Sequence, residues 1–148
     1  VDGKTIMPGI VDAHAHVGGF RHGLTAQKHW QLYANLAFGV TTSHDPSANS
    51  ESIFTLAEMI KNGEMVGPRL YSTGTILYGA EGNFKAVVNS LEDARSSIRR
   101  TKAFGALSVK SYNQPRREQR QQIIQAAREE EIFVVPEGAT STSPSFNS

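Results

Sequence analysis

The sequence predicts an α/β fold built from parallel strand–helix units. Short apolar runs rich in β-branched and aromatic residues alternate with longer segments of helical periodicity, and a strand recurs about every 30 residues. Such alternation is typical of βαβ units with right-handed crossovers. A closed eight-stranded α/β barrel needs about 250 residues. Because the chain has 148 residues, we expect only part of such a barrel, with the first five strands of a TIM-type (β/α)8 arrangement.

Five strands are predicted, and most lack a clean polar alternation, which indicates burial on both faces. They are Ile10–Ala13, Val40–Ser43, Arg69–Thr73, Leu107–Ser111 and Ile132–Pro136. Polar residues cluster just after each strand, where parallel sheets place their ligands.

Four helices are predicted between these strands from apolar residues at steps of three and four. They are Leu24–Phe38, Ser52–Lys61, Ser90–Phe104 and Gln114–Glu131. Asn62-Gly63 and Gly105 provide stop signals, and Pro115 suits a first helical turn. The tail at residues 139–148 is polar and small, and we expect it to be poorly ordered.

Composition excludes several classes of protein. Lysine and arginine number 15 against 14 acidic residues, so there is no electrostatic footprint for nucleic acid. The absence of cysteine excludes disulfide scaffolds and thiolate metal sites. No apolar run approaches the roughly 18 residues of a membrane span. The phosphate-loop motifs and the Gly-x-Ser-x-Gly elbow are also missing, which disfavours nucleotide binding and serine hydrolysis.

The strongest local motif is MPGIVDAHAHV at residues 7–17. Strand side chains alternate with period two, so His14 and His16 point to the same side, about 7 Å apart along the chain. Neutral imidazole is the commonest ligand for zinc and similar ions. The pair is either a metal site or two polar residues on a solvated strand end, and the buried strand before it favours the metal site.

The segment PGIVDAHAHVG resembles the first-strand signature of the metal-dependent amidohydrolase superfamily, which uses a (β/α)8 barrel. GVTTSHDP at 39–46 and GPRLYSTGTIL at 67–77 resemble its second and third strands, and residues 109–138 resemble the fourth and fifth strands of the imidazolonepropionase and prolidase-like branch. The resemblance runs from Gly3 to Gly138. It implies that residues 1–8 are the remnant of a preceding β-sandwich strand and that residues 9–138 form a partial barrel.

The resemblance also implies a set of metal ligands. His14 and His16 match the first-strand ligands, and Lys110 matches a lysine that is carboxylated in many members and bridges two metals. Carboxylation requires the neutral amine, because carbon dioxide does not react with the protonated form. The alternative for Lys110 is an ordinary ion pair with a carboxylate, in which the lysine stays protonated. Glu137 stands where much of the family has a histidine, and a carboxylate can also bind zinc. One or two divalent ions are expected, zinc first, with manganese or iron as alternatives.

Substrate contacts are expected from His22, His44 and Tyr112. His22 lies in a loop and is alternatively solvated, while His44 replaces the arginine common in the family and either lines the pocket or stacks in the barrel mouth. His29 is expected to be structural, and Asp45-Pro46 is interpreted as a turn that caps the next helix. Arg116, Arg117 and Arg120 form either an anion site or, more often, a solvated face.

The implied reaction is metal-assisted hydrolysis of C–N bonds in a small amide, cyclic amide or peptide-like substrate. The family's proton-shuttling aspartate follows the eighth strand, and a further histidine follows the sixth, so both are expected outside this chain. The alternative function is a non-catalytic half-barrel that binds metal or a small ligand. Open sheet edges predict self-association or pairing with the remainder of the barrel, and neither nucleic acid nor membrane is expected as a partner.

Overall fold

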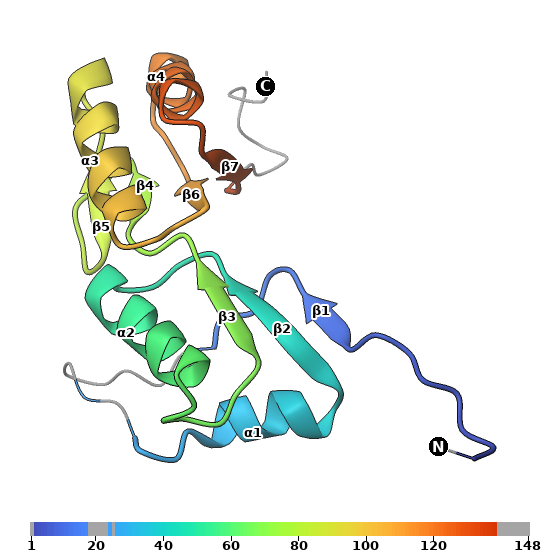
Figure 1. The fold of residues 1–148 in the computed structure, drawn as a ribbon. Coiled ribbons are helices and arrows are strands. Elements are labelled where there is room, and N and C mark those ends of the chain that lie inside the picture. Colours follow the sequence, from blue (N-terminus) through green and yellow to red (C-terminus); the bar gives the residue numbers. More distant parts are fainter. Residues whose placement is uncertain (1, 18–23, 25, 139–148) are drawn as a thin grey trace.

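The computed structural model describes residues 2–17, 24 and 26–138, which form alternating strands and helices (Figure 1). The described strands are β1 (Ile10–Asp12), β2 (Val40–Asp45), β3 (Arg69–Ser72), β4 (Ile76–Tyr78), β5 (Lys85–Val87), β6 (Ser108–Ser111) and β7 (Phe133–Pro136). The helices are α1 (Trp30–Ala37), α2 (Ser50–Lys61), α3 (Leu91–Ala103) and α4 (Arg117–Glu129). The expected disorder at 139–148 and the loop residue His22 lie outside the described residues.

Every strand pair described in the structure is parallel, which confirms the predicted fold class. One sheet has the order β1-β2-β3 and the other the order β5-β4-β6-β7. The arrangement is consistent with part of a TIM-type barrel. The predicted count of five strands is not confirmed, because β4 and β5 add two short strands that the sequence pattern did not indicate.

The chain passes from one sheet to the other within the three residues between β3 and β4. Gly74 adopts φ +61°, a left-handed conformation that favours glycine. The Ser50 hydroxyl, at the start of α2, accepts a hydrogen bond from Thr75 N at 3.0 Å and lies 3.1 Å from Thr75 Oγ1. The predicted third strand, Arg69–Thr73, is therefore present as β3, and a short turn anchored to α2 follows it and leads into β4.

Helices α2 and α3 begin directly after residues whose side chains cap them. Asn49 accepts a hydrogen bond from Ser52 N, and Ser90 accepts one from Asp93 N. Helix α1 is shorter than predicted, because His29 has an extended conformation and Trp30 is the first helical residue. Leu24, the expected first residue of that helix, is 74% exposed and so lacks the packing that would support another turn.

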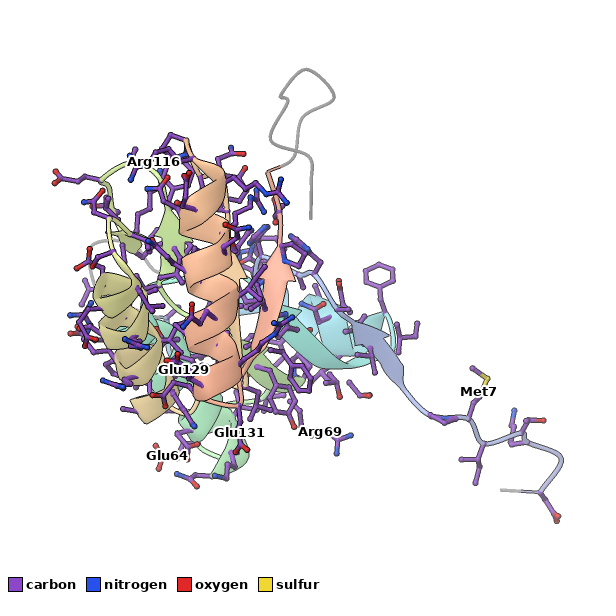
Figure 2. All side chains as sticks on the ribbon, turned by 90° about the horizontal axis from the view of Figure 1, so that it is seen from above. Met7, Glu64, Arg69, Arg116, Glu129 and Glu131 are labelled. Carbon is purple, nitrogen blue, oxygen red and sulfur yellow. The ribbon has the colours of Figure 1, made fainter. Side chains whose placement is uncertain are left out.

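Two apolar clusters hold the helices against the sheets. The larger cluster joins α3 and α4 to β4, β6 and β7 through residues such as Ile98, Val109 and Ile123. The second joins α1 and α2 to β3 through Leu32, Leu56 and their neighbours. By contrast, the first described residues extend away from the body of the molecule, and Met7 is 74% exposed (Figure 2).

None of the helices among the described residues is long and apolar enough to cross a membrane.

Helices α3 and α4 are joined along their solvent side by ion pairs. Arg95 Nε lies 2.7 Å from a Glu129 carboxylate oxygen, and Arg99 Nε lies 2.8 Å from Glu130. The hydrogen bond from Arg95 lowers the pKa of Glu129 to about 2.

This pairing predicts how stability changes in acid. Because the folded-state pKa of Glu129 is depressed, its stabilisation is present above the ordinary pKa of 4.5 and is lost as the pH falls toward 2. In thermal melts, Glu129→Gln should lower Tm at neutral pH and approach the wild type near pH 2. Glu64→Gln, which changes another exposed carboxylate, should leave the profile unchanged. A gap between Glu129→Gln and wild type that stays constant with pH would contradict the prediction.

Candidate metal centre

The carboxyl ends of β1, β6 and β7 bring three of the predicted site residues together. Glu137, directly after β7, has its Oε2 atom 2.5 Å from Lys110 Nζ on β6 and 3.2 Å from His14 Nε2 beyond β1. His16 lies beside His14, with ring centroids 5.2 Å apart and an edge-on arrangement. All four predicted ligands therefore lie in one region, although their sequence positions span most of the chain.

Lys110 is the most deeply buried of these residues, with a side chain 3% exposed, whereas the Glu137 side chain is 34% exposed. Lys110 belongs to β6, a strand in which every residue is buried. Main-chain contacts fix Glu137, since its N–H donates to Ser111 O at 3.0 Å and Arg120 Nη2 donates to its carbonyl at 3.1 Å. Lys110, through hydrogen bonding and then charge, lowers the pKa of Glu137 despite partial desolvation.

Asp45, at the end of β2, is a second buried carboxylate next to the histidine pair. Its Oδ1 accepts the Ser47 N–H at 3.0 Å and its Oδ2 accepts the Val17 N–H at 3.2 Å. His16 Nδ1 lies 3.4 Å from Oδ1. Burial raises the pKa of Asp45, and the Ser47 hydrogen bond and His16 act in the opposite direction. The sequence assigned Asp45 to a turn that caps the next helix. The Ser47 contact fits a turn, but the residue that caps α2 is Asn49. Nothing in the sequence indicated that Asp45 contacts His16.

His44 joins the two sheets. Its Nε2 atom is 2.8 Å from Ser108 Oγ on β6, and burial lowers the pKa of the ring. Its predicted role, either lining the pocket or stacking in the barrel mouth, stays a prediction. Ser108 was missed by sequence reasoning, because a lone serine in a buried strand carries no signal of its cross-sheet partner.

Tyr112 lies beside the cluster, with Lys110 Nζ 4.9 Å from the centre of its ring. Its ring packs against Tyr78 at 5.3 Å, and Lys85 Nζ lies 4.5 Å from the Tyr78 ring centre. Tyr112 is therefore close enough to the predicted ligands to contact a substrate held there. Tyr112 and Tyr78 form an aromatic wall, and Lys85 lies against the Tyr78 ring. Tyr78 and Lys85 belong to β4 and β5, the two strands that the sequence pattern did not indicate.

The donor atoms around Glu137 decide whether a metal ion suits the site. Within the described ranges, no three His, Cys, Asp or Glu side chains form a ready-made cluster around one point. Glu137 Oε2 is nevertheless a buried carboxylate oxygen, and the Lys110 and His14 nitrogens lie close to it at 2.5 and 3.2 Å. Two imidazoles and a carboxylate oxygen are donors that zinc accepts. The residues present are chemically compatible with a divalent cation.

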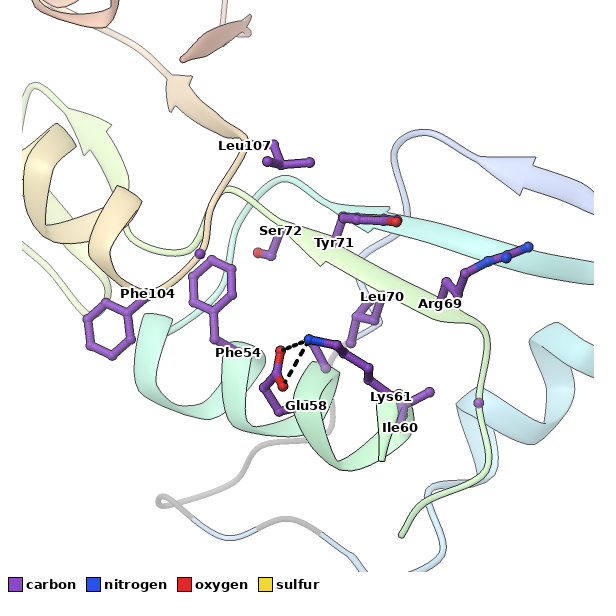
Figure 3. Close-up of a pocket in the computed structure, with 13 residues that line it drawn as sticks. Phe54, Glu58, Ile60, Lys61, Arg69, Leu70, Tyr71, Ser72, Phe104 and Leu107 are labelled. Atoms are coloured by element: carbon purple, nitrogen blue, oxygen red, sulfur yellow. Dashed lines mark hydrogen bonds and ion pairs between the residues drawn. The ribbon is translucent and has the colours of Figure 1, made fainter. Parts of the chain in front are cut away.

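A separate groove of about 660 Å³ lies along β3 (Figure 3). It is bounded by β3, by α2 and by the segment before β6, and Phe54 and Phe104 stack at one side of it. Its carboxylate, Glu58, is paired with Lys61 at 3.3 Å. The groove has no histidine in its lining, so it lacks the ligand chemistry found around Glu137.

Comparison with known proteins supports the same fold. The sequence matches no protein-family model and no curated protein. Among solved structures, a Xaa-Pro dipeptidase with methionine bound in its active site aligns over 88% of this chain, with a TM-score of 0.69 and 20% identity. A bottromycin amidohydrolase aligns over 87%, with a TM-score of 0.70 and 23% identity. An ochratoxinase from A. niger aligns over 91%, with a TM-score of 0.68 and 17% identity.

The resemblance to amidohydrolases is confirmed at the level of the fold. The chain spans 43%, 28% and 43% of the lengths of the dipeptidase, the bottromycin amidohydrolase and the ochratoxinase. It therefore corresponds to less than half of each of these proteins.

The unequal burial of Lys110 and Glu137 predicts unequal effects of mutation. In the metal-free protein, Glu137→Gln leaves a buried ammonium without its counter-ion and should destabilise the fold by about 3 kcal/mol, at the low end for a broken buried pair. Lys110→Met leaves a carboxylate that water reaches, and it should cost about 1 kcal/mol. The double variant should resemble Lys110→Met. Urea unfolding with chelator present measures all three, and a larger loss for Lys110→Met than for Glu137→Gln would contradict this view of the pair.

Proposed function

We propose that this chain supplies the metal-binding part of an amidohydrolase that cleaves C–N bonds in a small amide, cyclic amide or peptide-like substrate. The observation that carries the proposal is the meeting of His14, Lys110 and Glu137 at the carboxyl ends of β1, β6 and β7. Active sites of (β/α)8 enzymes lie at this end of the strands. The amidohydrolase fold of the solved structures adds support.

In the proposed centre, His14, His16 and Glu137 would hold one or two divalent ions, with zinc as the first candidate. A bound ion of this type activates water near neutral pH and polarises a carbonyl group. Lys110 would serve either as the counter-charge of Glu137, as its 2.5 Å contact suggests, or, once carboxylated, as a bridging ligand. Carboxylation forms an N–C bond between the neutral amine and carbon dioxide and releases one proton.

Other residues of the chain would shape the substrate site. Tyr112 and Tyr78 offer an aromatic wall next to Lys110, against which an apolar substrate group could pack. His22 remains a predicted substrate contact outside the described residues. The acid–base residue of the reaction is proposed to lie beyond this chain, as the family resemblance implies.

The second candidate is a module that binds a metal or small ligand without turnover. Val11 on β1 and Phe133 on β7 are apolar residues of edge strands, and they are 63% and 78% exposed. Exposed apolar residues of this kind favour association through open sheet edges. Such association is expected for both candidates. Both candidates can use the same metal centre, so metal binding is the first property to measure.

We expect the purified chain to bind zinc and His14→Ala/His16→Ala to lose that binding. Metal removed by chelator and restored by titration, followed by calorimetry and elemental analysis, gives the stoichiometry. Glu58→Gln, which removes the Lys61 partner in the separate groove, is the matched control and should bind as the wild type does. Equal zinc binding by the double variant and the wild type would refute the proposed centre.

A further inference from the structure

Asp45 and His16 form a contact whose role goes beyond the turn that Asp45 makes. We infer that Asp45 is a positioning residue, which holds the His16 ring with its proton on Nδ1 and so leaves Nε2 available as the ligand nitrogen. The part of the inference that concerns the ligand rests on the proposed metal centre. The part that concerns the proton position is a property of the metal-free chain.

The Asp45 carboxylate is fixed in place without help from His16. The residue is 2% exposed, and the N–H groups of Ser47 and Val17 each bind one of its two oxygens. Its carbonyl oxygen accepts the Thr73 N–H at 3.1 Å and the Ser72 hydroxyl at 2.6 Å. These contacts tie Asp45 to the neighbouring strand β3, so the carboxylate is a rigid reference point for any group facing it.

The main chain on both sides of His16 is attached to the same short segment. Ala15 N donates to His44 O at 2.9 Å, and Val17 N donates to Asp45 Oδ2 at 3.2 Å. These two bonds flank His16 and fix its main chain, while its side chain is 55% exposed. Asp45 Oδ1 then faces Nδ1 of the ring at 3.4 Å.

The chemistry of the pair decides the position of the proton. An ionised carboxylate can only accept hydrogen bonds, so a neutral imidazole facing it is favoured with its proton on the facing nitrogen. The lone pair is then on Nε2. A carboxylate behind a ligating histidine is a common arrangement in metal sites, where it fixes ring orientation and raises the basicity of the ligand.

The neighbouring histidine is held differently and provides a contrast. Asp12 Oδ1 accepts the main-chain N–H of His14 at 3.1 Å, so it contacts the backbone of that residue. The His14 ring nitrogen Nε2 faces Glu137 at 3.2 Å. Asp12 and Asp45 each lie near one of the two histidines, but the ion-pair contact with the ring belongs to Asp45. Asp12→Asn is therefore a matched control for Asp45→Asn.

Nuclear magnetic resonance on metal-free, ¹⁵N-histidine-labelled chain tests the inference, at a pH where the imidazoles are neutral. We expect the wild-type His16 ring to carry its proton on Nδ1. Asp45→Asn should shift His16 toward the other tautomer or a mixture, whereas Asp12→Asn should leave His16 unchanged. A purely structural turn at Asp45 predicts lower stability in Asp45→Asn with no change in tautomer.

Zinc titration against a competing chromophoric chelator provides the second readout. Asp45→Asn should weaken zinc binding by about 10–100-fold, the range for loss of such a supporting carboxylate, and Asp12→Asn should change it by less than threefold. A proton on Nε2 in the wild type overturns the inference, even if Asp45→Asn fails to fold. An unchanged tautomer in folded Asp45→Asn does the same. If the wild type has the expected tautomer but binds no zinc, the positioning role stands and the proposed function fails.

Discussion

The contact of one carboxylate with two nitrogens organises the candidate site. Glu137 Oε2 meets Lys110 from its own sheet and His14 from the other sheet, so it links β7 and β6 to β1 at a point where no backbone pairing joins them. Burial of the Lys110 ammonium is costly unless such a partner pairs with it. The position of Glu137 in turn depends on the parallel register of β6 and β7, in which Ser111 lies opposite Pro136.

Features set by local pattern could be predicted from the sequence. The four helices and the parallel strands follow from apolar spacing. His14 and His16 were singled out by the period of a strand, although both lie beyond the end of β1 in the structure. The strands β4 and β5 were not predicted; each has three residues, and β4 directly follows the turn at Gly74. The true start of α1 also depends on tertiary packing, which propensity does not report.

The candidate site likewise has residues that could be predicted from the sequence and residues that could not. Lys110 and Glu137 were predicted through a family resemblance, and their contact with each other requires the observed register of two strands. Ser108 beside His44 and Asp45 beside His16 are long-range neighbours without any local signature. The sequence therefore predicted which residues carry ligand chemistry. It could not predict which residues orient them, because orientation comes from contacts between strands that are distant along the chain.

We propose that a divalent ion binds where β1, β6 and β7 end. Anomalous X-ray scattering at the zinc absorption edge, from crystals of the chain grown with zinc, locates such an ion. An anomalous peak is expected in contact with His14 and His16 and near Glu137. A fully loaded crystal whose anomalous peaks all lie elsewhere, with these three side chains unligated, would contradict it.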